Sequence, residues 1–598
     1  MVGLIWFRKK TQTQVVSMDN QRLFLFAALA MVLMLIYQQW QVDYGQQPQV
    51  ATEQAQTIAG TETGPETADS ADEAIPAAPG SATAITTTGT GSATADTKSK
   101  MVEIITDLFE IKVDTNKGTI VEAKLRNYPV SLEQKDTPTA ILKDEIDGAL
   151  SAQSGLTPAK GIANAIKKAV FSVEKERYAL EEGADELRVP FSWTGDNGIK
   201  LTKTFVFKRD SYLINVEQQL QNNSESEWSG SFYGRLRLIP REMEEPGLLS
   251  GAQSFTGGAI SLEDTKFEKV SLDDIKEDWS KEFSGTKGGL IKSKGGWTAM
   301  IQHYFIAAWI PSQEETNYYM TSYSGKTDSH YMTVTETQKS VAPGESYTFT
   351  HGLYIGPKIQ NIMEQVAPNL DRTVDYGPLF FLSQPLFWLL EKIHGVLGNW
   401  GVAIIVLTIF LKLLFFKLSE KSYKSMAKMK KLGPKMKQIK ERHGEDKQKM
   451  NQAMMELYKK EKVNPLGGCL PILVQMPFFL ALYWMLLESV ELRQAPFMLW
   501  IVDLSIKDPY FILPLIMGGT MLIQQRLNPA QMDPTQQRMM MLMPIIFTFM
   551  FLWFPAGLVL YWVVNNLLSI AQQWVITRRV EKEENEPKPP KKTKKAKA

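Results

Sequence analysis

The chain has 598 residues, of which 44% are hydrophobic and 22% are charged, and its formal net charge is +1. This length exceeds that of an ordinary single domain, and the near-zero net charge argues against a protein that binds nucleic acid through its whole surface. One cysteine, Cys469, excludes an intramolecular disulfide, and the five histidines have no metal-ligand spacing. Neither a disulfide framework nor a zinc site is therefore expected.

An apolar segment near the N-terminus predicts a first membrane anchor over residues 23–40. Basic residues precede it, and the stretch YQQWQVD at its end lacks the small residues of a signal-peptide cleavage site. We therefore expect an uncleaved anchor whose N-terminal part, residues 1–22, lies in the cytoplasm. Within that part, residues 1–17 precede a second methionine, Met18, and are interpreted as an upstream start-site extension.

A polar linker and a β-rich domain are predicted next. Residues 41–100 are rich in Ala, Thr, Ser and Gly and have few large apolar side chains to bury, so they should be disordered. Residues 101–368 then alternate as strands do, with turn signals at Asn116-Lys117-Gly118, Gly195–Gly198 and Arg209–Ser211. This pattern predicts an antiparallel β-sandwich on the far side of the membrane, because membrane segments precede and follow it.

An amphipathic helix over residues 379–397 is interpreted as lying in the outer membrane interface, with a packed linker helix as the alternative. Five more apolar segments predict the remaining spans: Trp400–Phe416, Leu466–Leu487, Tyr510–Ile523, Met539–Phe554 and Leu558–Ile576. Their basic flanks fall on one side, so six spans would place both termini in the cytoplasm. Several segments are short, which helix tilt or a locally thinned bilayer would accommodate.

Lys412 interrupts the apolar run Val406–Phe416. A lysine near the centre of a membrane helix costs about 2.5–3.5 kcal/mol to insert. Two explanations remain open. The ammonium could snorkel to the cytoplasmic interface near Lys417, or it could face a polar cavity among the spans.

Polar side chains on other predicted spans favour the cavity. Thr408 shares a helix face with Lys412, and Gln475 lies in the third span. One face of the last span carries Tyr561, Asn565, Ser569 and Gln572. Such faces should meet one another rather than lipid, either as dry hydrogen bonds between helices or around water. No acidic residue within a span is an obvious partner for Lys412, so its charge would be available to a substrate.

The segment between the second and third spans, residues 417–462, predicts a basic antiparallel helical hairpin. Its helical pieces should be separated at Gly433-Pro434 and at His443-Gly444. Methionine and leucine recur along both pieces at helical spacing. This surface suits anionic lipid, contact with nascent chains, or both. The basic tail, residues 577–598, suits lipid head groups or ribosomal RNA.

Four stretches together resemble the YidC/Oxa/Alb family of membrane insertases. They are NPLGGCLPILVQMPFFLALYWML (Asn464–Leu486), VELRQAPFMLWIVDLS (Val490–Ser505), DPYFILPLIMG (Asp508–Gly518) and MPIIFTFMFLWFPAGLVLYW (Met543–Trp562). The resemblance covers nearly the whole chain from Met18, and the large domain after the first span is similar to that of the Gram-negative members.

The resemblance implies an α-helical polytopic membrane protein with six spans. Residues 101–368 would be a periplasmic all-β supersandwich, and residues 400–576 would hold five spans around a hydrophilic groove, with the cytoplasmic hairpin between two of them. The groove's single positive charge, normally an arginine, falls on Lys412, which keeps the charge but loses the bidentate fork. The family's substrate-contacting aromatic residue falls on Tyr561 or Trp562.

The function implied is insertion, and assisted folding, of nascent membrane proteins in the bacterial inner membrane, alone or with the Sec translocon and the ribosome. Hydrophobic transfer would drive insertion, so neither a cofactor nor enzymatic activity is expected, and no phosphate-binding loop motif occurs. Two alternatives have other requirements. A carbohydrate-active or carbohydrate-binding periplasmic domain would pair His303 or His330 with a carboxylate, and a secondary transporter would need paired ionisable residues at mid-membrane.

Overall fold

The computed structural model describes residues 100–144, 148–158, 169–195, 198–241, 254–285, 289–443, 446–461, 463, 470–527 and 534–585. All of them belong to one unit, Asp72–Ala598. The predicted first anchor, residues 23–40, lies outside the described residues. So do all but the last residue of the predicted linker and the end of the basic tail.

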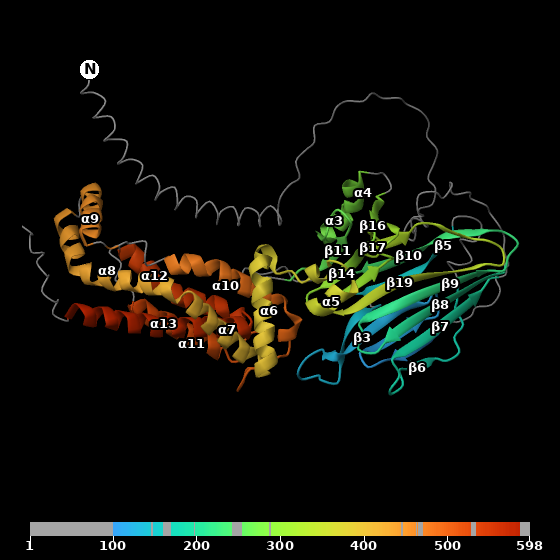
Figure 1. The fold of residues 1–598 in the computed structure, drawn as a ribbon, viewed down its shortest axis with the longest axis horizontal. Helices are drawn as coiled ribbons and strands as arrows, with labels where there is room; N and C mark the ends of the chain where they lie inside the picture. The colour runs from blue at the N-terminus through green and yellow to red at the C-terminus, as the bar shows by residue number, and fades with distance from the viewer. Residues whose placement is uncertain are drawn as a thin grey trace, which may run out of the picture. The chain divides into compact units, whose positions relative to one another are not determined.

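Two β-sheets form the first half of the described chain (Figure 1). The larger sheet has 11 strands, in the order β13 (Ile291–Lys294), β16 (Thr316–Ser324), β17 (Ser329–Glu336), β10 (Trp228–Leu238), β5 (Leu150–Pro158), β4 (Pro138–Lys143), β3 (Thr119–Pro129), β2 (Phe109–Asp114), β1 (Met101–Ile105) and β6 (Arg177–Ala179), with β18 (Lys339–Val341) beside β10. The smaller sheet has eight, in the order β12 (Glu268–Val270), β11 (Gly257–Ser261), β14 (Trp297–Gln302), β15 (Phe305–Ile310), β19 (Ser346–Pro357), β9 (Leu213–Asn222), β8 (Ile199–Lys208) and β7 (Glu186–Thr194).

The predicted hairpins are confirmed. Strands β2 and β3 pair antiparallel about the turn at Asn116-Lys117-Gly118, where Lys117 and Gly118 have φ of 60° and 56°. Positive φ at two adjacent positions suits a tight hairpin turn. Strands β7, β8 and β9 also pair in sequence order. Among the described strands, neighbours run antiparallel except β1 and β6, which are parallel.

The core of this domain lies between the two sheets, because large side chains from both meet there. Phe232 of β10 packs edge-on against Trp309 of β15, with ring centroids 5.9 Å apart. A Cβ added at Gly234 would lie 2.7 Å from the Trp309 ring, so only glycine fits at this point. Lys203 of β8 is also buried, and its ammonium donates to the carbonyls of Gly118 at 2.7 Å and Ser154 at 2.9 Å.

Helices dominate the remainder. Two short ones, α3 (Leu272–Lys276) and α4 (Trp279–Ser284), flank β16. The segment after the sheets contains α5 (Gln360–Val366), η1 (Leu370–Thr373), η2 (Gly377–Leu379) and α6 (Phe380–Leu397). The others are α7 (Trp400–Leu414), α8 (Phe416–His443), α9 (Lys447–Glu461), α10 (Leu470–Glu488), η4 (Val490–Leu492), α11 (Ile512–Leu527), α12 (Pro534–Met550), η5 (Phe551–Trp553) and α13 (Ala556–Asn585). Helix α6 runs across the direction of α10 and α13 (Figure 1).

The predicted helical hairpin forms, with one correction. Helix α8 ends at His443 and α9 begins at Lys447, as expected, but α8 continues through Gly433-Pro434. Proline removes one hydrogen bond of the helix, and packing on both sides of it offsets that loss. Leu432 and Met436 are buried against Val463, and side chains of α9 surround them. The stripe of methionine and leucine is therefore largely the internal core of the hairpin.

No single described helix is both long and apolar enough to cross a membrane, whereas α7 and α8, bent by 67° at their junction, have the required length and hydropathy as a pair. The six predicted spans remain a prediction.

Candidate functional site

Lys412 lies in the last turn of α7. Asn399 caps the N-terminus of this helix, since its side chain accepts a hydrogen bond from the Val402 N–H at 3.0 Å, and the helix ends at Leu414 before the bend into α8. The unpaired carbonyls at a helix C-terminus favour a cation by about 0.3–1 kcal/mol. The local fold therefore offsets part of the cost of placing an ammonium in this apolar sequence.

The Lys412 ammonium points toward α13. Its Nζ donates to the Ser569 hydroxyl at 2.7 Å, and that hydroxyl in turn donates to the Asn565 carbonyl at 2.7 Å. Ser569 is buried. No carboxylate lies within ion-pair distance of Lys412 among the described residues. The Lys412 ammonium is thus hydrogen-bonded to an uncharged hydroxyl, and no described carboxylate compensates its positive charge.

Five of the predicted site residues line a single small cavity. It is bounded by α7, α10 and α13, and its lining comprises Thr408, Leu411, Lys412, Phe415, Gln475, Phe478, Tyr561 and Asn565. A volume of about 10 Å³ is open to the centre of a water-sized sphere, which is room for about one water molecule. The cavity is therefore narrower than the groove that the family resemblance implies.

The other predicted residues lie around this cavity. The Gln572 amide approaches the Phe416 carbonyl at 3.5 Å, where α7 passes into α8. The Thr408 hydroxyl donates back to the Ile404 carbonyl at 2.7 Å, so it lines the cavity with its donor already used. The two candidate aromatic residues separate. Tyr561 lines the cavity, whereas Trp562 packs edge-on against Phe479 with ring centroids 4.4 Å apart.

A second polar contact between helices was missed by the sequence reasoning. The buried Asn566 amide donates to the Thr520 hydroxyl of α11 at 3.2 Å. Asn566 is one residue beyond the polar face of α13 that was singled out, and one residue turns a helix by about 100°. It therefore faces a different neighbour from Asn565. Two adjacent asparagines were the available signal for polar contacts on two sides of this helix.

A buried ion pair connects the β-domain to the helices away from this cavity. Lys358, just after β19, donates to Glu488, the last residue of α10, at 2.9 Å. Its Nζ also approaches the Thr373 carbonyl at 3.4 Å. Burial lowers the pKa of Lys358, and the facing Glu488 carboxylate opposes that shift. Nearby, His303 Nε2 lies 3.1 Å from the Leu487 carbonyl.

Among the described residues, neither His303 nor His330 makes the ion pair with a carboxylate that the enzymatic alternative would need. His303 contacts a backbone carbonyl, and the His330 ring lies 4.9 Å from that of Tyr323. A buried histidine–carboxylate pair occurs elsewhere, with His351 Nε2 2.5 Å from Glu336 Oε1. The His351 ring stacks on Phe232, inside the sandwich core. Within the described residues, no group of three or more metal-ligating side chains comes together.

Comparison with known proteins gives consistent matches. Residues 101–389 match the family model described as the YidC periplasmic domain, and residues 392–584 match that of the 60Kd inner membrane protein. The chain is 48% identical to the membrane protein insertase YidC of Nitrosococcus oceani, over 95% of this chain and 100% of that one. It is 47% identical to the membrane protein insertase YidC of Thioalkalivibrio sulfidiphilus, over 94% and 99%.

A solved structure, described as an active YidC insertase with the first transmembrane domain resolved, is 17% identical to this chain. It aligns over 79% of this chain and 92% of that one, with a TM-score of 0.35.

Proposed function

Because this chain belongs to the YidC family of membrane insertases, we propose that it inserts the apolar segments of nascent proteins into the bacterial inner membrane. It would also help them to fold, alone or with the Sec translocon. In this proposal the β-domain is periplasmic, and six spans leave both termini in the cytoplasm.

The observation that carries the proposal is the charged, polar cavity at Lys412. Five polar side chains from three apolar helices meet there, and the ammonium has a hydroxyl rather than a carboxylate as its partner. Polar groups that face one another lower the cost of bringing a short polar segment part-way into the bilayer. Lys412 attracts acidic groups on that segment, and transfer of the apolar segment into lipid supplies the driving force.

Substrate entry requires the helices to separate. The cavity has room for about one water molecule, and a polypeptide segment is far larger. Helices α10 and α13 are the elements to move, because they form the wall opposite Lys412. Their outer surfaces are apolar, with Met476 and Leu567 exposed by 42% and 50%. A substrate segment that passes between these helices therefore moves from the polar wall of the cavity directly to an apolar surface that suits contact with lipid.

The basic hairpin and α6 have supporting roles. The apolar stripe of the hairpin packs in the hairpin's own core. Helices α8 and α9 would therefore present a lysine-rich surface to a ribosome or to anionic lipid. Helix α6 runs across α10 and α13 (Figure 1). It exposes Phe381 and Trp388, each by 59%, on the side opposite its buried residues. This arrangement suits a helix that lies in the outer membrane interface.

The test places a photo-crosslinking amino acid at Gln475, at Trp562 or at Leu413 in the full-length protein. Gln475 lines the cavity, Trp562 lies on the neighbouring face of α13, and Leu413 points outward with 66% of its surface exposed. Each variant is challenged with a ribosome-bound, stalled nascent chain that carries one apolar segment. The matched substrate carries the same chain with that segment made hydrophilic.

Crosslinks at Gln475 and Trp562 that exceed those at Leu413, and that vanish with the hydrophilic substrate, are the expected result. Equal crosslinking at all three positions would mean that substrates contact the helices from the lipid and not through the cavity. No crosslinks at any position, with the nascent chain still reaching the membrane, would place the substrate path elsewhere.

A further inference from the structure

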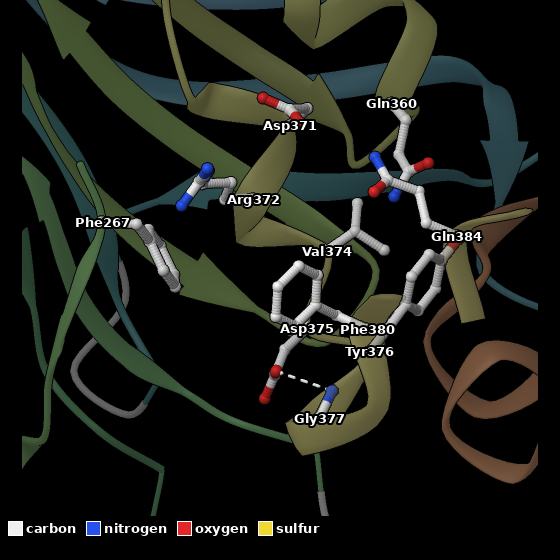
Figure 2. A pocket seen from close by; sticks show the side chains of 10 residues that line it. All are labelled: Phe267, Gln360, Asp371, Arg372, Val374, Asp375, Tyr376, Gly377, Phe380 and Gln384. Carbon is white, nitrogen blue, oxygen red and sulfur yellow. Dashed lines mark hydrogen bonds between the residues drawn. The ribbon is translucent and has the colours of Figure 1, made fainter. Parts of the chain in front are cut away.

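A second, larger pocket lies where the β-domain meets α6. Its volume is about 270 Å³, and the residues around it come from the loop before β12, from α5, η1 and η2, and from α6 (Figure 2). They are Phe267, Gln360, Asp371, Arg372, Val374, Asp375, Tyr376, Gly377, Phe380 and Gln384. Figure 2 shows Arg372 and Phe267 on one side and Gln360 and Gln384 on the other.

Part of this lining is a fixed frame. Asp375 Oδ1 accepts a hydrogen bond from the Gly377 N–H at 3.0 Å, and its other carboxylate oxygen pairs with Lys269. Gly377 has a φ of 66°, and a Cβ there would lie 3.0 Å from the ring of Trp484 in α10. The hydrogen bond from Gly377 and the ion pair with Lys269 therefore hold the turn that leads into α6. The Asp375 carboxylate is already paired with a cation.

Four other polar side chains of the lining are unused. The side chains of Gln360, Asp371, Arg372 and Gln384 make no hydrogen bond or ion pair with another described residue. Asp371 and Arg372 are adjacent in η1, and they carry opposite charges without pairing to each other. The pocket thus offers a free carboxylate and a free guanidinium side by side, with two free amides across from them.

We propose that this pocket binds a zwitterionic group in which a phosphate and an ammonium are joined by a short linker, as in phosphoethanolamine. A guanidinium binds a phosphate through two parallel hydrogen bonds, and the neighbouring carboxylate accepts from the ammonium. The glutamine amides donate to ester or phosphate oxygens. The volume lies just below the range of about 300–1,000 Å³ typical of small-molecule sites, so it suits a head group rather than a larger ligand.

The head group would come from a phospholipid of the outer leaflet. Phe380 lines the pocket and is 57% exposed, and the next residue along α6, Phe381, is 59% exposed. Acyl chains could follow these aromatic side chains while the head group occupies the pocket. This lipid source rests on the proposed position of α6 in the outer interface, whereas the chemistry of the pocket does not.

The experiment measures binding of short-chain lipids to the full-length protein in a non-ionic maltoside detergent, by calorimetry. The ligands are dihexanoyl phosphatidylethanolamine, dihexanoyl phosphatidylglycerol and soluble glycerophosphoethanolamine. The variants are Arg372→Gln and Asp371→Asn, with Arg177→Gln as the matched control. Arg177 is an exposed arginine of β6 that belongs to neither pocket. Thermal unfolding of each variant confirms that the fold is retained.

The expected result is that the protein binds phosphatidylethanolamine more tightly than phosphatidylglycerol. Each pocket variant weakens that binding by about tenfold or more, because each removes at least one hydrogen bond to a charged group, while Arg177→Gln does not. Equal affinity for both lipids would overturn the zwitterionic assignment, and equal affinity of all variants would overturn the site. Binding of glycerophosphoethanolamine as tight as that of the lipid would overturn the lipid source alone. Because no substrate is present, none of these outcomes depends on the insertion proposal.

Discussion

Replacing Glu488 by leucine should loosen the junction between the β-domain and the helices, because it leaves the buried Lys358 ammonium without its carboxylate. The two side chains are 1% and 6% exposed, and the ammonium lies 2.9 Å from the carboxylate oxygen. At this distance, an effective dielectric constant of about 20 gives an attraction of about 6 kcal/mol. Desolvation of two ions, at several kcal/mol each, offsets most of it.

The net contribution of the intact pair is therefore small, whereas the broken pair costs about 3–5 kcal/mol. Exchange of the protected amides in α5 and η1 should rise by roughly 140- to 3,700-fold, since every 1.4 kcal/mol corresponds to a factor of ten. Hydrogen exchange with mass spectrometry on the detergent-solubilised protein measures this change peptide by peptide.

The double variant Lys358→Met with Glu488→Leu separates charge from packing. It removes both ions and keeps similar volumes, so protection of α5 should return close to that of the unmodified protein. Wild-type protection in Glu488→Leu alone would refute the reasoning. So would additive losses in the double variant, because they would show that the two residues contribute independently.

Three other substitutions test the charged cavity, a buried lysine and a glycine turn. Lys412→Glu should slow insertion of a segment with an acidic tail by about tenfold relative to one with a neutral tail, about 1.4 kcal/mol of attraction; equal rates in a liposome insertion assay would exclude the attraction step. Burial lowers the pKa of Lys203 to about 7, against 10.5 for an ordinary lysine. The unfolded chain therefore binds more protons between these values, and the free energy of unfolding should rise with pH by at most about 5 kcal/mol across that window. Lys203→Met should remove this slope in thermal melts recorded from pH 7 to 10. Gly377→Ala should destabilise by about 1–2 kcal/mol from backbone strain plus the contact with Trp484. Gly398→Ala has the same φ of 66° with no atom within 4 Å, so it should cost less in the same melts.

Local sequence signals predicted the β-domain well because each hairpin is specified within about twenty residues. The turn at Asn116-Lys117-Gly118 and the order of β7, β8 and β9 need no distant information. By contrast, the ammonium of Lys203 that holds the Gly118 carbonyl comes from 85 residues away, and the Lys358–Glu488 pair joins residues 130 apart. Neither could be deduced from spacing, because only the tertiary fold brings these groups together.

In the helical part, tertiary packing outweighs a local sequence signal. Pro434 is a strong local signal for a helix break, yet packing of Leu432 and Met436 against Val463 keeps α8 continuous. For the cavity, helical spacing was sufficient to select side chains of α13 that share a face with Asn565. It could not tell how closely α10 and α13 approach each other, and that distance decides how much water the cavity admits.

The continuity of α13 has a mechanical consequence. This one helix carries Asn565 at the cavity and Val580 near its end, where Val580 and Ile576 pack against Ala427 of the hairpin. Fifteen residues of helix separate Asn565 from Val580, a lever arm of about 22 Å. A tilt of only 5° about the hairpin contact would shift the cavity wall by about 2 Å on this arm, most of the width of a water molecule. Force applied to the hairpin, such as that of a ribosome docked there in the proposed function, would therefore be transmitted along α13 to the wall of the cavity.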